Sequence, residues 1–214
     1  MTTTCLAVLV NGLPGAGKTT LARALACDLR LPLFSKDVIK EAHADVLGTE
    51  RPGWPQRRWN AAIGAAASET MWALLADAPA GAVLESTWPA DRRHFAERGL
   101  SRAGGPPVLE IWCEVPLETA RQRFEARPPR HPIHGDPLTD QEWERWREHA
   151  RPLELGPTLR VDTRQPVDRR PVLAWIQAQR RPFRHGGPSV TMDEPNAVLA
   201  RGAIRDDRRP RPGT

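Results

Sequence analysis

The stretch LVNGLPGAGKTTLARAL, residues 9–25, sets glycines, a lysine and two threonines between an apolar run and a segment of helical period. Gly12, Gly17, Lys18 and Thr19 match the pattern G-x-x-x-x-G-K-[ST], with a predicted strand before it and a predicted helix after it. Glycines let successive backbone N–H groups turn inward around phosphate oxygens, and the start of the following helix offers its unpaired donors to the same anion. The stretch therefore predicts a loop that binds nucleotide phosphates.

Two side chains of this loop indicate which nucleotide and which metal it serves. Lys18 can neutralise charge on the β- and γ-phosphates, and the hydroxyl of Thr19 can complete the coordination shell of a Mg²⁺ that bridges phosphate oxygens. We therefore expect ATP and Mg²⁺ as cofactors, with Thr19 as the metal ligand. The residues expected to bind the nucleotide here are Gly12, Pro14, Gly15, Ala16, Gly17, Lys18, Thr19 and Thr20. The alternative is a flexible surface turn, against which the flanking strand and helix argue.

Apolar runs bounded by turn residues alternate with longer segments of helical period along the chain. Strands are predicted at 5–10, 32–35, 81–86, 107–113 and 158–163, and helices at about 17–29, 37–47, 55–78, 90–103, 116–127, 139–150 and 167–180. Pro55 and Pro116 suit first helical turns, and Thr139 with Glu142 forms a predicted capping box. Residues 128–138 hold four prolines and must leave the neighbouring helices. The pattern predicts an α/β fold with a five-stranded parallel sheet and helices on both faces.

Length and charge favour one domain with a tail. The 214 residues suffice for one core, which we expect over residues 1–180. Residues 181–214 lose apolar periodicity and are rich in Pro, Gly and Arg, so this tail is predicted to be disordered. The tail holds seven arginines against four acidic residues, which leaves a net charge of only +2 on the rest of the chain. A nucleic-acid partner is therefore possible but not favoured.

The cysteines and apolar runs bear on localisation. Cys5, Cys27 and Cys113 are odd in number and lack paired metal-ligand spacing, which favours free thiols in a reducing compartment. No apolar run reaches the roughly 18 residues of a membrane span, and neither export nor insertion is indicated. We predict a cytoplasmic protein. His131, His134 and Asp136 lack a fourth ligand for zinc, so we do not expect a zinc site there.

With GLPGAGKTT as the most specific part, residues 5 to 180 resemble the P-loop kinases of small acceptors: gluconate kinase, chloramphenicol phosphotransferase, zeta-type toxins and the 5′-kinase module of polynucleotide kinase. The resemblance implies a P-loop NTPase fold, a three-layer sandwich with an arginine-bearing lid. In this group a short second strand ends with an Asp about twenty residues beyond the loop lysine, and PLFSKDVIKE offers Asp37 there. A carboxylate near the γ-phosphate can take the proton of an acceptor hydroxyl, which makes Asp37 the candidate general base. The alternative is an acid that only stabilises a helix N-terminus.

The acceptor side has weaker candidates. Lys36 and Lys40 flank Asp37 in a chain with one other lysine, so they could hold an anionic acceptor, or Lys40 could be a solvated helix charge. The run AVLEST ends in Glu85, where such kinases often carry an acid, with Thr87 beside it. The resemblance implies that Glu85 holds a metal-bound water or an acceptor hydroxyl; a structural role stays open. The loops after the second and third strands also nominate Trp54, Trp59, Trp88, Arg92 and Arg93, although packing is the alternative for each tryptophan.

The segment LETARQRFEARPPR resembles the lid of the same kinases, in which arginines close over the nucleotide. Arg123 and Arg127 lie one helical turn apart and share a face, and Arg130 starts the proline-rich excursion. Arginine binds phosphate oxygens with two parallel donors, so Arg127 is the catalytic candidate and Arg123 a nucleotide-binding one. A solvated arginine stripe is the alternative. Residues 161–166 lie where related kinases pass beside the adenine.

The resemblance implies an ATP-dependent phosphotransferase with an alcohol group as acceptor. The acceptor class stays open among sugar, antibiotic, nucleoside and nucleotide-sugar, and the oligomeric state is not determined by the sequence. Two alternatives remain: a polynucleotide 5′-hydroxyl kinase, and a non-kinase ATP-binding regulatory module, for which an acceptor base would not be needed.

Overall fold

The structure, a computed structural model, describes residues 5–128, 131–134 and 137–180. Its strands are β1 (Leu6–Gly12), β2 (Leu33–Ser35), β3 (Gly81–Glu85), β4 (Val108–Glu114) and β5 (Thr158–Asp162). Its helices are α1 (Lys18–Leu29), α2 (Lys36–Leu47), α3 (Gln56–Ala76), α4 (Arg93–Arg102), α5 (Leu117–Ala126), α6 (Asp140–His149) and α7 (Arg169–Arg180), with short 3₁₀ turns η1 (Ala90–Arg92) and η2 (Pro132–His134). Every predicted strand and helix is present, and the helix expected at 90–103 is divided into η1 and α4. The predicted tail, 181–214, lies outside the described residues.

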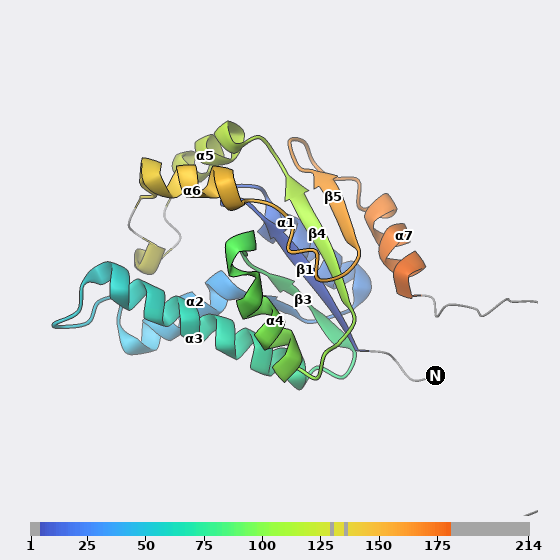
Figure 1. Cartoon of the computed structure of the whole chain (residues 1–214), viewed down its shortest axis with the longest axis horizontal. Helices are drawn as coiled ribbons and strands as arrows, with labels where there is room; N and C mark the ends of the chain where they lie inside the picture. Colours follow the sequence, from blue (N-terminus) through green and yellow to red (C-terminus); the bar gives the residue numbers. More distant parts are fainter. Residues whose placement is uncertain (1–4, 129–130, 135–136, 181–214) are drawn as a thin grey trace, which may run out of the picture. The chain divides into compact units, whose positions relative to one another are not determined.

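The five strands form one parallel sheet in the order β2-β3-β1-β4-β5 (Figure 1). Because all strands run the same way, their carboxyl ends meet at one edge of the sheet. The phosphate loop follows the central strand β1, and β1 has β3 and β4 as its neighbours. From β1 the chain crosses to β2 on one side, whereas from β4 it continues to β5 on the other, which opens a crevice at this edge where ligands of α/β proteins bind.

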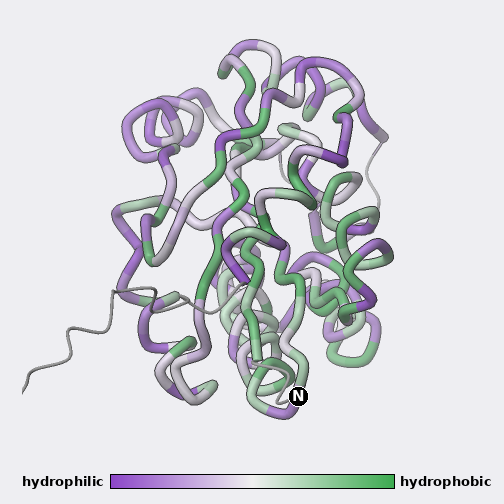
Figure 2. Tube along the Cα trace, turned by 90° about the vertical axis from the view of Figure 1, so that its right-hand side faces the viewer, coloured by the Kyte–Doolittle hydropathy of each residue, from purple (hydrophilic) through white to green (hydrophobic). Residues whose placement is uncertain are grey.

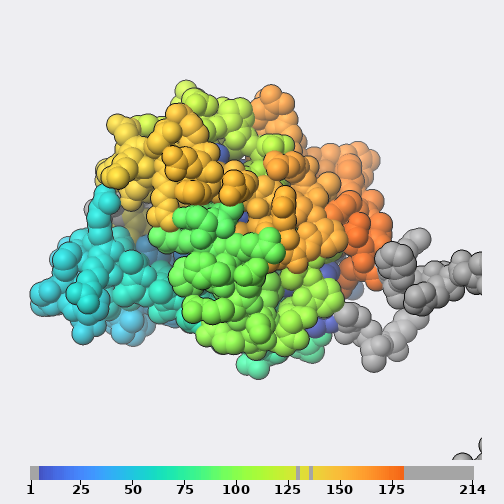
Figure 3. Space-filling view, in the orientation of Figure 1, coloured from blue at the N-terminus to red at the C-terminus, as the bar shows by residue number. Residues whose placement is uncertain are grey.

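Helices cover both faces of the sheet because alternate residues of the strands point to opposite sides. Val8 and Val10 of β1 pack in a core with α1 and α7, whereas Ala7 and Leu9 pack in a second core with α3 and α4. Figure 2 shows the hydrophobic residues along the central strands and the hydrophilic ones toward the periphery. Figure 3 shows α4 and α6 in front of the sheet, with α2 and α3 to one side. The predicted three-layer α/β architecture is confirmed.

The ends of three helices show how local sequence signals act. Thr139 caps α6 in a capping box: its hydroxyl accepts a hydrogen bond from the Glu142 N–H, and the Glu142 carboxylate accepts one from the Thr139 N–H, as predicted. Pro55 and Pro116 each occupy the N-cap position, one residue before the first turn in which they were expected. Their missing N–H costs nothing at either position.

Among the described residues, no helix combines the length and apolar character needed to cross a membrane.

Candidate active site

The phosphate loop joins β1 to α1 through glycines in conformations that other residues rarely adopt. Gly15 and Gly17 have φ angles of 82° and 81°, in the left-handed region. A side chain on Gly12 would approach the Cys113 carbonyl oxygen at 2.7 Å, and one on Gly15 would overlap the backbone carbonyl of Ala120 in α5. The loop is therefore held between the end of β4 and the lid helix, and its glycines are required by close packing as well as by backbone geometry.

Lys18, the first residue of α1, is buried at the centre of this loop. Its Nζ donates a hydrogen bond to the Leu13 carbonyl oxygen at 2.8 Å, so the lysine closes the loop on itself. Burial lowers the pKa of Lys18, while the carboxylates of Glu85 and Asp37 raise it and the Arg127 guanidinium lowers it further. The charge of the Lys18 ammonium is thus favoured by two nearby carboxylates and opposed by burial and by one guanidinium.

Glu85 ends β3 beside the loop and is 3% exposed. Its Oε1 accepts a hydrogen bond from the Thr19 hydroxyl at 3.3 Å, and its Oε2 accepts one from the Ser35 hydroxyl at 2.6 Å. Ser35 is the last residue of β2, so the ends of two adjacent strands and the first turn of α1 hold this carboxylate. Ser35 was not singled out from the sequence, because only the pairing of β2 with β3 brings it to Glu85.

The oxygens of Thr19 and Glu85 fit the predicted Mg²⁺. Magnesium prefers oxygen ligands and is bound in such sites by one or two protein groups together with phosphate oxygens and water. Here a hydroxyl and a buried carboxylate lie side by side and are hydrogen-bonded to each other. A bound Mg²⁺ would be held by Thr19, with Glu85 next to it.

A cavity of about 800 Å³ extends from the phosphate loop to the lid. Its lining includes Pro14, Gly15, Gly17, Lys18, Thr19, Thr20, Asp37, Lys40, Glu85, Thr87, Arg123 and Arg127, all of which were predicted as site residues. Gly12 and Ala16 are buried beneath the loop and do not line it. Asp37 lies in the first turn of α2, where the helix dipole also favours an acid, so both interpretations of this residue remain compatible with its position.

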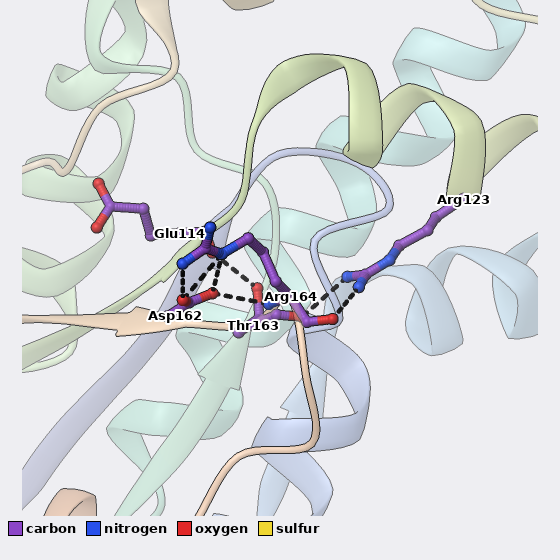
Figure 4. Close-up of polar contacts among 5 residues, drawn as sticks. All are labelled: Glu114, Arg123, Asp162, Thr163 and Arg164. Carbon is purple, nitrogen blue, oxygen red and sulfur yellow. Dashed lines mark hydrogen bonds and ion pairs between the residues drawn. The ribbon is translucent and has the colours of Figure 1, made fainter.

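Arg123 extends from α5 to the segment after β5 (Figure 4). Its guanidinium donates hydrogen bonds to the carbonyl oxygens of Thr163 at 2.9 Å and Arg164 at 2.7 Å. Arg164 in turn pairs with Asp162, and this hydrogen bonding lowers the pKa of Asp162 to about 2. Arg123 therefore ties the lid helix α5 to residues 163 and 164, in the segment that the resemblance to related kinases places beside the adenine.

Arg127, at the end of α5, is exposed at the mouth of the cavity. Its guanidinium lies over the Phe124 ring, 5.1 Å from the centroid, and its charge acts on Lys18. The two arginines predicted to belong to the lid thus differ in their contacts: Arg123 is fixed on backbone carbonyl oxygens, whereas the Arg127 guanidinium lies over the Phe124 ring. Arg130 lies outside the described residues.

The two histidines after α5 face α2. His134 lies 3.1 Å from Glu41 and His131 lies 3.0 Å from Asp45, so η2 is joined to one face of α2. Asp136, the third residue of the zinc pattern, lies outside the described residues. Ile133 between the histidines is fully buried. Sequence reasoning assigned neither histidine a role, because their partners lie far away in the chain.

Helix α3 adds lining residues that sequence reasoning missed, namely Arg57 and Asn60. Arg57 forms an ion pair with Glu142 of α6 at 3.4 Å, across the cavity mouth.

The residues nominated for the loops after the second and third strands are Trp54, Trp59, Trp88, Arg92 and Arg93, and none of them lines the cavity. Trp88 is buried against Trp72, and Trp54 and Trp59 pack edge to face at the α2–α3 loop. The packing interpretation of these tryptophans is therefore correct.

A parallel sheet that brings a glycine loop, a lysine, a threonine hydroxyl and a buried carboxylate to one edge defines a P-loop nucleotide-binding protein. Residues 8–153 match the family model of the AAA domain (AAA_33), and the chain belongs to this family. A comparison with curated protein sequences gives no match.

Solved structures with the same fold include kinases. A proposed kinase from Chloroflexus aurantiacus is 31% identical, with a TM-score of 0.67 over 82% of this chain and 98% of that chain. A sugar kinase from a Janibacter species is 22% identical (TM-score 0.53; 81% and 95% covered), and a shikimate kinase from Acinetobacter baumannii is 17% identical (TM-score 0.55; 84% and 96% covered). The last two show the fold alone. The resemblance to P-loop kinases of small acceptors is confirmed.

Proposed function

We propose that this protein is an ATP-dependent kinase that transfers the γ-phosphoryl group to a hydroxyl of a small molecule. The observation that carries the proposal is the shared cavity, which is lined both by the phosphate loop and by Asp37, Lys40 and Thr87. A nucleotide on the loop would have its γ-phosphate directed at these residues. The 31% identical kinase-like structure from Chloroflexus aurantiacus supports the same class of reaction.

In this proposal the residues of the cavity divide between the nucleotide and the acceptor. The backbone of residues 12–20 and Lys18 bind the triphosphate, and Arg127 stabilises charge on the moving phosphoryl group. The oxygen of the acceptor hydroxyl bonds to the γ-phosphorus, and Asp37 accepts the proton that this hydroxyl loses. The bond between the γ-phosphorus and the oxygen that bridges it to the β-phosphate breaks, and ADP leaves. Mg²⁺, held by Thr19 beside Glu85, would neutralise phosphate charge. Lys40, Glu85 and Thr87 orient the acceptor, and Arg123 supports the nucleotide through residues 162–164.

The experiment is transfer of label from γ-labelled ATP to panels of sugars, antibiotics, nucleosides and nucleotide-sugars. Lys18→Ala should lose transfer and ATP binding together. Asp37→Asn should keep ATP binding within about threefold and lose transfer by about 10²–10⁴-fold, as expected for a general base. Asp77→Asn is the matched control, because Asp77 is an exposed C-cap of α3 outside the cavity, and it should transfer normally.

Two outcomes would replace the proposal. Label that enters 5′-hydroxyl oligonucleotides but no small molecule would indicate a polynucleotide kinase. A nucleotide-gated module would be indicated if label appeared only as inorganic phosphate with every acceptor class, and if Asp37→Asn released phosphate at the wild-type rate.

A further inference from the structure

Asn11, the residue before the phosphate loop, has a fully buried side chain with every hydrogen-bonding position used. Its Oδ1 accepts hydrogen bonds from the Gly12 N–H at 2.8 Å and the Trp88 N–H at 2.9 Å. Its Nδ2 donates to the Trp88 carbonyl oxygen at 3.1 Å and to Glu110 Oε1 at 3.0 Å. One carboxamide therefore binds both backbone groups of Trp88 and the first N–H of the loop.

Glu110 lies in the middle of β4 and is also fully buried. Besides Asn11, its carboxylate accepts hydrogen bonds from the Leu153 N–H at 3.0 Å and the Glu154 N–H at 2.9 Å. These three N–H donors satisfy the buried carboxyl oxygens, and no salt bridge to Glu110 is formed within the described residues. Glu154 has a φ of 55°, a conformation that a non-glycine residue keeps only when its surroundings hold it.

Two of the segments held by this pair belong to or adjoin the cavity lining, and the third follows α6, which contributes Glu142 and Trp146 to that lining. Gly12 starts the phosphate loop, Trp88 follows the lining residue Thr87, and Leu153 and Glu154 lie in the connection from α6 to β5. In Figure 3 this connection runs beside α4, and the Arg93 guanidinium donates to the Leu153 carbonyl oxygen at 2.8 Å. The pair thus joins the phosphate loop, the Thr87–Trp88 loop and the connection from α6 to β5.

Stability alone does not account for a carboxylate at this position. The neighbours of Glu110 in β4, Leu109 and Ile111, are apolar and buried, and well-packed apolar residues often replace buried polar groups at no cost in stability. A carboxylate with a carboxamide, however, can direct four loop N–H groups at fixed angles, which an apolar pair cannot do.

We propose that Asn11 and Glu110 are positioning residues that hold the phosphate loop, the Thr87–Trp88 loop and the 153–154 segment in the one arrangement that aligns donor and acceptor. The kinetic part of this inference rests on the proposed function. Neither residue touches the substrates, so the pair acts on the reaction only through the backbone it holds. Misplacement of reacting groups by about 1 Å can cost about 100-fold in rate.

The deciding variant is Asn11→Asp. It keeps the shape of the side chain but sets a second carboxyl group 3.0 Å from Glu110, where the amide nitrogen was. Two carboxylates this close cannot both be ionised, so the variant keeps its geometry only while the pair shares a proton. The shared proton replaces the hydrogen bond to Glu110 but not the one to the Trp88 carbonyl oxygen, so transfer by Asn11→Asp should be below that of the wild type at acidic pH. Relative to the wild type, it should fall further, by about 100-fold, as the pH rises. The affinity for Mg·ATP should change by less than about threefold.

The double variant Asn11→Asp with Glu110→Gln is the rescue. The amide introduced at position 110 can donate to the carboxylate introduced at position 11, which removes the repulsion between two carboxylates, so the additional loss at high pH should disappear. The Leu153 N–H, which Glu110 Oε1 accepts in the wild type, loses its acceptor in this variant, so a constant loss that does not depend on pH should remain. If Asn11→Asp follows the wild-type pH profile, or loses ATP affinity as much as transfer, the proposal is wrong and the pair has only a structural role.

A second measurement needs no enzymatic activity and no variant. In the wild-type protein, the amide hydrogens of Trp88, Leu153 and Glu154 should exchange with solvent with one common opening free energy, because one pair of side chains holds them. Opening free energies that differ among these three amides would overturn the proposal. If the wild type transfers no phosphate but its three amides share one opening free energy, the proposed kinase function is wrong, while the joining of the loops by Asn11 and Glu110 is supported.

Discussion

The thiol of Cys113 illustrates how one residue is controlled by its surroundings. Cys113 is 1% exposed at the end of β4, and burial raises the pKa of its thiol to about 12 although Lys18 nearby lowers it. Since the thiolate is the reactive form, we predict that alkylation at about pH 8 leaves Cys113 unmodified in the native protein. Cys27 on α1 is exposed and should be modified. Mass spectrometry of the labelled protein checks both sites.

Denaturant supplies the control for this prediction. All three cysteines are free in the structure, so each should be labelled once the chain unfolds. Modification of Cys113 in the native protein at the rate of Cys27 would show that the end of β4 opens readily. The packing of Cys113 against Gly12 would then be looser than described.

At the same scale, the sequence predicted the phosphate loop well, because all of its residues are contiguous and act through their own backbone. Asp37 and Glu85 were nominated because the resemblance places acids after the second and third strands, and both lie at the cavity, since parallel strand ends converge. Asn11 and Glu110 were missed, although Glu110 interrupts the apolar run PVLEIWC and could have signalled a buried polar contact. Its partners at Leu153 and Glu154 depend on a loop whose path no local pattern specifies.

Helices α3 and α4 pack so closely at Gly99 that there is no room for a side chain at this position. A side chain on Gly99 of α4 would overlap the Trp72 indole of α3, and Trp72 is buried against Trp88. A rigid ring in a close-packed core cannot move aside cheaply. We predict that Gly99→Ala lowers the free energy of unfolding by about 1–3 kcal/mol, despite the better helix propensity of alanine. Urea denaturation measures the change.

Gly64 in α3 is the matched control, because a side chain there would meet nothing within 4 Å. Gly64→Ala should raise the free energy of unfolding by about 0.5–1 kcal/mol through helix propensity and the restricted unfolded chain. Equal effects of the two substitutions would mean that the Gly99–Trp72 contact does not limit the helix spacing.

Element boundaries were predictable where a local signal marks them, as the capping box of Thr139 and Glu142 does. The association of elements was not, since the order β2-β3-β1-β4-β5 depends on which faces bury together. The roles of Arg123 and Arg127 show the limit: they share a helix face in sequence, yet only the neighbouring β5 provides the carbonyl oxygens that hold Arg123.

For the whole molecule, the arrangement of the cavity depends on contacts between segments far apart in the chain. The end of α5, η2 and α6 face α2 and α3 across it, joined by His134 with Glu41, His131 with Asp45, and Arg57 with Glu142. Surface ion pairs of this kind contribute little each, about 0–1 kcal/mol. These three polar contacts alone therefore hold the lid side onto α2 only weakly.

The pair of His134 with Glu41 makes this attachment depend on pH. Burial lowers the pKa of His134 from 6.5, with Lys40 in the same direction and the carboxylates of Asp37 and Glu41 in the opposite one. Since the docked state favours the neutral ring, its stabilising contribution is complete above pH 6.5 and is lost as the pH falls below it. We predict that acidification from about pH 7.5 to about 5.5 weakens protection of the Ile133 amide in the wild type and does so less in His134→Gln.

Hydrogen exchange of the Ile133 amide at matched pH measures this protection. The control is His43→Gln, elsewhere on α2, which is expected to behave like the wild type. Protection that increases on acidification would mean that the ion pair with Glu41 outweighs burial, and that protonation holds the lid side onto α2.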